Sequence, residues 1–343
     1  MWSPDASMEG LYRAYERKRE KQRAEWAEQT KEEQRKRLVH SLAVPMEELD
    51  ELRPVLLERV ELEDHIRERV EFGTFWGFRV PAYVLLPKGV VGKSAAVLAL
   101  HGHGYGSRQI VGLNADGTDH IGESDIHGNY ALEMVRRGFV VIVPEVLGFG
   151  DRRLEADQRS GQVGNSSCQT LASHLMLYGV SIAAVRVQEA RRALDYLMTR
   201  EEVDVNRMGC FGFSGGGLLA AYTAACDERI QAAVLCAFTN TFKGSIMSIH
   251  HCIDNYVPGV LDYAELPELV GLLAPRPLFI ASGRQDPIFP IATVEAAVSY
   301  LKQVYQKEGV GERLGVHLYE GVHEVKGDQA YPWLVEALMG NES

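Results

Sequence analysis

A serine enclosed by glycines is the first candidate for chemistry in this 343-residue chain. Ser214 lies in GFSGG, residues 212–216, after an apolar run and before an alanine-rich segment. A sharp turn from a strand into a helix crowds the backbone, and glycines relieve the crowding because they carry no Cβ. The pattern G-x-S-x-G in this setting predicts that Ser214 is a nucleophile.

A serine hydroxyl becomes a good nucleophile only beside a base that a third group orients. Asp286 follows the apolar run 277–282, and His323 follows the run 314–319, whereas His317 lies inside that run and is expected to be structural. The chain order serine, aspartate, histidine is typical of a nucleophile on such an elbow. We therefore predict that Ser214, His323 and Asp286 form a catalytic triad.

Acyl transfer also needs hydrogen-bond donors for the developing oxyanion. One donor is expected to be the backbone N–H of Gly215, directly after the nucleophile. The other is expected in the loop HGHG, residues 101–104, where the backbone N–H of His103 is the candidate. Its glycines let the backbone approach an anion closely.

The same loop allows an alternative, a zinc site. His101 and His103 could bind the ion together with His120, His127 or the pair at 250–251. No further carboxylate or histidine follows at the spacing of a known metal motif, and the triad already accounts for the loop. We therefore predict no metal and no cofactor.

The elements that must position these residues follow from the apolar pattern. Short apolar runs without alternation are typical of strands buried on both faces, and helical patterns between them indicate crossover connections. The expected class is α/β, a mostly parallel sheet of about eight strands flanked by helices. The expected strands are 95–100, 139–143, 207–213, 232–238, 277–282 and 314–319, and the clearest helix is 180–199.

The first part of the chain has a different composition. Residues 9–38 are rich in charge and in good helix formers, which predicts a largely solvated helix. We expect it to dock on the domain or to act as an oligomer-forming arm, with a lid as a minor alternative. The predicted organisation is a charged helical extension, 1–74, that leads into the first strand, and a catalytic domain, 75–343.

Charge and cysteine content restrict the partners. The formal net charge is −11, which argues against nucleic acid, because phosphate binding needs clustered lysine and arginine. The five cysteines form an odd set without a C-x-x-C pair, which fits unpaired thiols in a reducing compartment. No secretory leader and no apolar run of membrane-spanning length are seen. We expect a cytoplasmic protein that does not bind membranes.

The motifs together resemble those of the α/β-hydrolase superfamily. HGHG at 101–104, GFSGG at 212–216, Asp286 and His323 occur in the expected order. The chain is most similar to the branch related to dienelactone hydrolases and acetyl xylan esterases, through LLPKG (85–89), HHCIDNYVPG (250–259), LLAPRPLFIASGRQDPIFP (272–290) and GVHE (321–324). The resemblance implies a serine esterase acting on a small carboxylic ester, with an acetyl or other short acyl group. Dienelactone hydrolases use a cysteine nucleophile, so Ser214 points to an ester or related acyl substrate instead.

Substrate contacts are expected in the loops between strands, where binding residues usually lie. The candidates are Tyr105, Glu145, Arg152, His250 and Asn255. Two other functions stay open: an amidase or peptidase of the same fold, and a catalytically silent binding protein on this scaffold.

Overall fold

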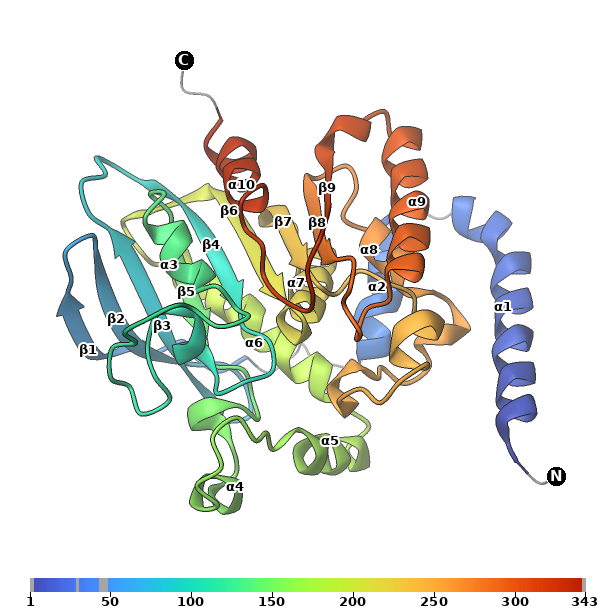
Figure 1. The fold of residues 1–343 in the computed structure, drawn as a ribbon, viewed down its shortest axis with the longest axis horizontal. Helices are drawn as coiled ribbons and strands as arrows, with labels where there is room; N and C mark the ends of the chain where they lie inside the picture. The colour runs from blue at the N-terminus through green and yellow to red at the C-terminus, as the bar shows by residue number, and fades with distance from the viewer. Residues whose placement is uncertain (1–2, 29–30, 43–48, 341–343) are drawn as a thin grey trace.

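The computed structural model describes residues 3–28, 31–42 and 49–340, and its centre is a nine-stranded sheet. The strands lie in the order β1-β2-β3-β5-β4-β6-β7-β8-β9 (Figure 1). Neighbours from β5 to β9 pair in parallel, whereas β1, β2, β3 and β5 pair antiparallel in succession. The strands are β1 Val55–Glu61, β2 His65–Gly73, β3 Arg79–Pro87, β4 Ser94–Leu100, β5 Val140–Pro144, β6 Val203–Phe213, β7 Ile230–Cys236, β8 Leu278–Gly283 and β9 Leu314–Tyr319.

The six apolar runs form the six parallel strands, β4 to β9. Every residue of β4, β5 and β8 is buried, because helices cover both faces of this part of the sheet. The carboxyl ends of these strands therefore meet at one edge, where β4, β6, β8 and β9 deliver the loops that carry the predicted site. The predicted fold class is confirmed.

The antiparallel strands β1 and β2 extend the sheet beyond the predicted runs. Ile66 pairs with Leu86 of β3, and Glu61 of the exposed strand β1 pairs with Ile66. The predicted division after residue 74 thus falls between two paired strands of one sheet. Charged side chains occupy much of β1 and β2, which is why neither strand forms a plain apolar run in the sequence.

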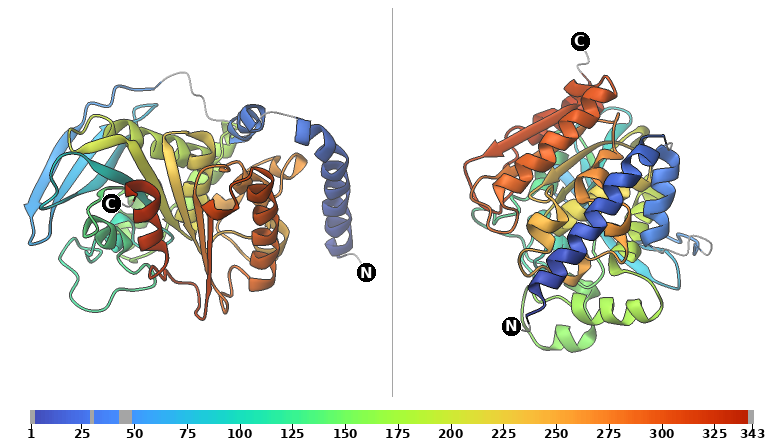
Figure 2. Two further views of the ribbon diagram at one scale, coloured as in Figure 1. Left: turned by 90° about the horizontal axis from the view of Figure 1, so that it is seen from above. Right: turned by 90° about the vertical axis from the view of Figure 1, so that its right-hand side faces the viewer.

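Helices pack on both faces of the sheet. The core on one face includes α3 and α10, and the core on the other face includes α6, α7, α8 and α9. The left-hand view in Figure 2 shows these layers edge on. The helices are α3 Tyr130–Val135, α4 Glu155–Arg159, α5 Cys168–Leu177, α6 Ile182–Leu197, α7 Gly215–Cys226, α8 Leu266–Gly271, α9 Ile291–Lys307 and α10 Ala330–Met339.

Two helices precede the sheet, α1 Asp5–Glu28 and α2 Lys31–Leu42. The right-hand view in Figure 2 shows α1 lying obliquely across one end of the molecule. Its Tyr12 hydroxyl donates to Glu265 Oε1 at 3.1 Å, and Arg19 donates to the carbonyl of Leu261 at 2.5 Å. The predicted helical extension is thus attached to the segment before α8.

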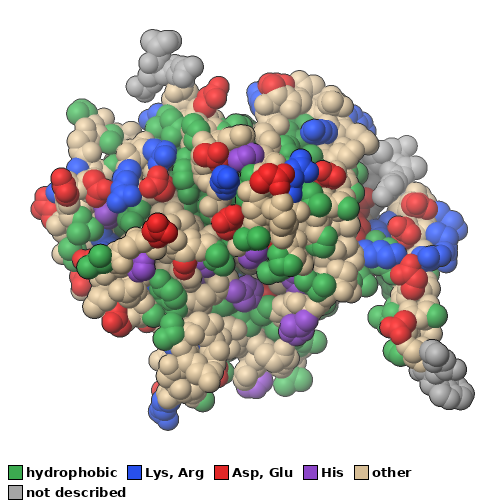
Figure 3. All heavy atoms as spheres, in the orientation of Figure 1, with side chains coloured by type: hydrophobic (Ala, Val, Ile, Leu, Met, Phe, Trp, Pro, Cys, Tyr) green, Lys and Arg blue, Asp and Glu red, His purple; other side chains and the backbone are tan. Residues whose placement is uncertain are grey.

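The surface mixes both signs of charge. Figure 3 shows acidic and basic side chains interspersed over one face, with several histidines among them. Among the described helices none is by itself long and apolar enough to cross a bilayer; α5 and α6 reach that length only together, and their axes differ by 99°.

Candidate active site

Ser214 occupies the turn between β6 and α7 in a conformation that few residues adopt. Its φ is +55° and its ψ is −120°, and its N–H donates to the carbonyl of Cys236 at 2.9 Å. Positive φ in a residue other than glycine stores strain and is typical of functional sites. A Cβ at Gly216 would overlap the carbonyl oxygen of Leu100, which explains a glycine two residues after the serine.

Ser214, His323 and Asp286 form a continuous chain of hydrogen bonds. Ser214 Oγ lies 2.9 Å from His323 Nε2, and His323 Nδ1 lies 2.8 Å from Asp286 Oδ2. The buried carboxylate of Asp286 also accepts backbone N–H bonds from Ile288 at 2.8 Å and Phe289 at 3.1 Å. Because two backbone donors hold its other oxygen, the carboxylate has one orientation toward the imidazole.

Two aromatic rings pack against the imidazole of His323. The Phe213 ring lies 4.8 Å away between centroids, and the Phe289 ring lies 5.7 Å away and nearly parallel to it. These contacts restrict rotation of the imidazole and keep Nε2 directed at Ser214.

The predicted oxyanion donors are the backbone N–H groups of Gly215 and His103. Gly215 is the first residue of α7, and N–H groups in the first turn of a helix have no partner within the helix. The side chain of His103 lies beside this residue, since a Cβ at Gly215 would stand 3.0 Å from His103 Nδ1. Within residues 3–28, 31–42 and 49–340, neither the N–H of Gly215 nor that of His103 donates a hydrogen bond. Both remain available to a ligand.

Two predicted substrate residues, Glu145 and Arg152, have partners inside the domain. Glu145 is buried and accepts hydrogen bonds from the N–H and hydroxyl of Ser107 at 2.8 and 2.7 Å. Arg152 makes a bidentate ion pair with Glu189 at 2.5 and 2.6 Å, and both side chains are buried. Both charges are paired, as burial of a charged group requires, and the roles of these two residues toward a substrate stay predictions.

The other three predicted substrate residues lie in loops at the same end of the sheet. The Tyr105 hydroxyl donates to the carbonyl of Leu113 at 3.0 Å. His250 is exposed, and Asn255 is buried, with its amide donating to Asp254 Oδ1 at 2.9 Å. Their roles toward a substrate stay predictions.

An apolar cavity lies between α1 and the chain segment 242–262. Its volume is about 730 Å³, and His250 and Asn255 help to line it together with Met8, Leu11, Tyr12 and Tyr15 of α1. Ser214 and His323 do not line it. His251 connects the cavity with the triad, because it lines the cavity and its ring contacts Phe289, which in turn stacks on His323.

The histidines of the alternative zinc site do not converge. His101 is buried, and its Nε2 accepts the N–H of Val146 at 3.1 Å. His120 is exposed and contacts Asn114 at 3.0 Å, and burial lowers the pKa of His127. Among the described residues, His103 is the one of these histidines that joins a group of three or more metal-binding side chains, and its neighbours there are not histidines.

A buried polar cluster that no sequence motif indicated lies next to His103. It contains Cys168, Cys252, Asp254 and Arg186. Burial alone would raise the pKa of Asp254, but Arg186 and His103 outweigh it and hold that pKa well below its usual range. Cys252 and Asp254 lie in the segment HHCIDNYVPG, but their distance in sequence from His103 and Cys168 left no readable spacing.

A sequence model of the Abhydrolase family matches residues 5–320 of the chain. A protein of Bacillus subtilis (strain 168) named as a hydrolase, YtaP, is 28% identical over 291 residues, which are 82% of this chain and 89% of that protein.

Solved structures share the fold at low sequence identity. A protein from Bacteroides fragilis NCTC 9343 described as an acetyl xylan esterase has a TM-score of 0.72 at 17% identity and covers 89% of this chain and 88% of its own. A glucuronoyl esterase from Solibacter usitatus has a TM-score of 0.62 at 15% identity, over 88% and 91% of the two chains. Acetyl xylan esterase 1 from Thermoanaerobacterium sp. JW/SL YS485 has a TM-score of 0.57 at 19% identity, over 90% and 93%.

Proposed function

This chain belongs to the Abhydrolase family, and from that premise we propose that it is a serine hydrolase that cleaves carboxylic esters. The observation that carries the proposal is the chain of hydrogen bonds from Ser214 through His323 to Asp286, at 2.9 and 2.8 Å. Such a relay is what a serine needs to attack a carbonyl carbon near neutral pH.

The first half of the proposed reaction makes an acyl-enzyme. Ser214 Oγ bonds to the ester carbonyl carbon while His323 Nε2 accepts the hydroxyl proton, and Asp286 stabilises the resulting imidazolium. The N–H groups of Gly215 and His103 receive the oxyanion. His323 then gives its proton to the alcohol oxygen as the carbon–oxygen bond breaks.

The second half repeats these steps with water. His323 takes a proton from water, the hydroxide oxygen adds to the acyl carbon, and the oxyanion again meets the two N–H groups. When the intermediate collapses, His323 returns the proton to Ser214 Oγ and the carboxylic acid leaves. Side chains, backbone N–H groups and water carry every step of this scheme.

We propose a small ester with an acetyl or other short acyl group as the substrate. Support comes from the acetyl xylan esterases among the structural neighbours, although they share only 17–19% of their residues with this chain. All five cysteines are unpaired in the described structure, which supports a reducing, cytoplasmic location.

A substrate panel tests the function. We expect hydrolysis of p-nitrophenyl acetate to exceed that of the butyrate and octanoate, with no cleavage of a peptide anilide. Faster anilide cleavage would support an amidase, and inactivity toward all four compounds would overturn the hydrolase proposal.

The nucleophile is tested by Ser214→Ala. The rate should fall by about 10⁴- to 10⁶-fold, the loss seen when a triad nucleophile is removed. Ser282→Ala is the matched control, because Ser282 is equally a serine near a strand end, is buried, and its hydroxyl has no hydrogen-bond partner among the described residues. An active Ser214→Ala variant would contradict the assignment.

A further inference from the structure

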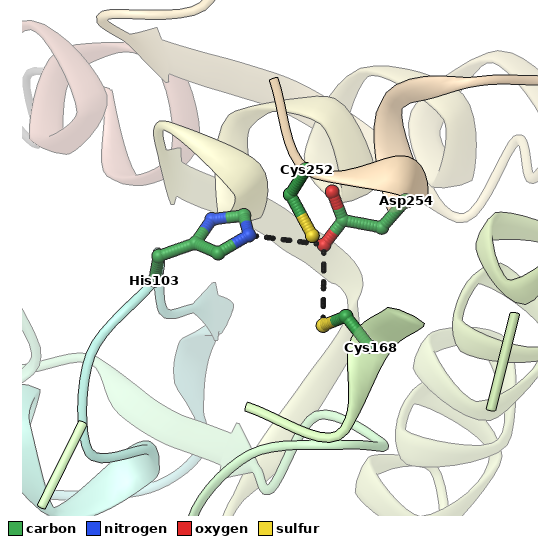
Figure 4. A group of neighbouring side chains, drawn as sticks. All are labelled: His103, Cys168, Cys252 and Asp254. Atoms are coloured by element: carbon green, nitrogen blue, oxygen red, sulfur yellow. Dashed lines mark hydrogen bonds and ion pairs between the residues drawn. The ribbon is translucent and has the colours of Figure 1, made fainter. Parts of the chain in front are cut away.

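Four side chains that could bind a metal meet beside the proposed oxyanion donors. His103 comes from the loop after β4, Cys168 begins α5, and Cys252 and Asp254 come from the segment before α8. One nitrogen, sulfur or oxygen atom from each side chain lies within 4.8 Å of those from the other three. Figure 4 shows the four side chains pointing toward one common point.

The separations fit a tetrahedral zinc site. Zinc binds nitrogen, oxygen and sulfur at about 2.0–2.3 Å, which places neighbouring ligand atoms of a tetrahedron about 3.3–3.8 Å apart. His103 Nε2 lies 3.2 Å from Asp254 Oδ2, and Cys168 Sγ lies 3.7 Å from the same oxygen. These two separations are already close to the tetrahedral spacing, and the ligand atoms of all four side chains lie within 4.8 Å of one another.

His103 Nε2 faces a charged neighbour, Asp254 Oδ2, at 3.2 Å. This nitrogen is shielded from solvent, and among the described residues it has no partner in hydrogen-bond geometry, even though Asp254 Oδ2 is close. Buried polar atoms in native structures nearly always have a partner. A metal ion at the common point would receive its lone pair.

The surroundings already hold two of the other proposed ligands, Asp254 and Cys168, in place. The buried Arg186 guanidinium donates to Asp254 Oδ2 at 2.6 Å and to Cys168 Sγ at 3.0 Å. The Asn255 amide donates to Asp254 Oδ1. Outer partners of this kind orient metal ligands and tune their basicity.

The charges also balance when zinc is bound. Two thiolates and one carboxylate carry three negative charges, which equal the positive charge of Zn²⁺ and the buried Arg186 together. The two thiol protons pass to solvent as the metal–sulfur bonds form.

We propose that His103, Cys168, Cys252 and Asp254 bind one Zn²⁺ in a closed, structural four-ligand site. Soft thiolate ligands together with imidazole favour zinc over the hard cations, and four protein ligands leave no position for substrate. The ion ties the oxyanion loop, α5 and the segment around Cys252 to one another. It thereby fixes the backbone of His103 next to Gly215, and its binding does not depend on which bond Ser214 cleaves.

Metal content and cobalt spectroscopy test the site. Protein purified without chelator should contain about one zinc ion per chain, as measured by elemental mass spectrometry. After removal of zinc by a chelator, Co²⁺ should produce visible ligand-field bands and near-ultraviolet thiolate charge-transfer bands, which Zn²⁺ then abolishes. A wild-type protein that neither contains zinc nor gives the cobalt spectrum would overturn the proposal.

Variants identify the ligands. Loss of a residue that hydrogen-bonds to a metal ligand weakens metal binding about 10- to 100-fold. Cys168→Ser and Cys252→Ser remove ligands themselves, so each should weaken zinc binding by more than that. Cys226→Ser is the matched control, since Cys226 lies at the end of α7 outside the cluster and should keep full binding. Equal binding by Cys252→Ser and Cys226→Ser would overturn the assignment. So would a Cys168–Cys252 disulfide in the purified protein. The wild-type cobalt spectrum decides the matter even where a variant does not fold.

Discussion

Phe289 stacks on the imidazole of His323, with ring centroids 5.7 Å apart and ring planes only 17° apart. The backbone N–H of the same phenylalanine donates to Asp286 at 3.1 Å. One residue therefore contacts both proposed partners of Ser214, the base through its ring and the acid through its backbone.

Replacing this ring should slow the reaction without preventing folding. An aromatic pair contributes about 0.5–1.5 kcal/mol beyond its buried area, so Phe289→Leu is expected to lower kcat roughly 2- to 10-fold with little change in KM. Phe238→Leu is the control, because Phe238 contacts Phe289 but not His323. Steady-state kinetics on p-nitrophenyl acetate checks this; equal kcat losses in both variants would contradict a positioning role.

The buried ion pair of Arg152 predicts a loss of stability instead of a loss of substrate affinity. Arg152→Met leaves Glu189 charged and unpaired in the interior, which should lower the free energy of unfolding by about 3–5 kcal/mol. Arg152→Met combined with Glu189→Met should recover most of that loss. Urea unfolding followed by circular dichroism measures both. A raised KM at unchanged stability would restore the substrate-binding interpretation.

The turn at Ser214 should not tolerate a methyl group at Gly216. Its Cβ would overlap the backbone carbonyl of Leu100, which cannot move aside without disturbing β4, so Gly216→Ala is expected to cost about 1–3 kcal/mol or more and to abolish activity. Gly10→Ala in α1 meets nothing within 4 Å and should instead stabilise its helix by about 0.5–1 kcal/mol. Thermal unfolding and esterase assays compare the two, and an active Gly216→Ala variant would refute the steric argument.

Asp125 should contribute stability that is lost in acid. Burial would raise the pKa of Asp125, but hydrogen bonds from His127 and Gln109 outweigh it and lower that pKa from the ordinary 3.8 to about 2. A pKa that is lower in the folded state stabilises the protein above the ordinary value, and this stabilisation disappears as the pH falls from about 4 to 2.

Asp125→Asn should accordingly be less stable than wild type at pH 5, and the difference should shrink toward pH 2.5. Urea unfolding across this range measures the slope, and Glu63→Gln at an exposed bend is the control. A difference that does not vary with pH would exclude this linkage.

The parallel half of the sheet was predictable because each of its strands is a short run of apolar residues. The expected strand 314–319 coincides with β9, and the expected helix 180–199 contains α6. The positions of Ser214, Asp286 and His323 followed from the ends of these runs. The antiparallel strand β1 has no core-facing pattern, because nearly all of its residues are exposed at the edge of the sheet.

Other parts depended on contacts that no local pattern records. Glu145 and Arg152 follow a strand at the active edge, which suggested substrate contacts, yet their partners Ser107 and Glu189 come from distant segments. The cluster around His103 is equally non-local. Its cysteines lacked metal-motif spacing, so they were interpreted as ordinary buried thiols.

The N-terminal helix α1 has a further consequence for handling the protein. Its Met8, Leu11, Tyr12 and Tyr15 form one wall of the apolar cavity, while the sheet and Ser214 lie elsewhere. Proteolytic loss of α1 would therefore leave the catalytic groups in place but expose the apolar lining of that cavity to solvent. We expect an enzyme that lacks α1 to precipitate or self-associate before it loses esterase activity. A recombinant tag is therefore better placed at the carboxyl end, where it does not disturb α1.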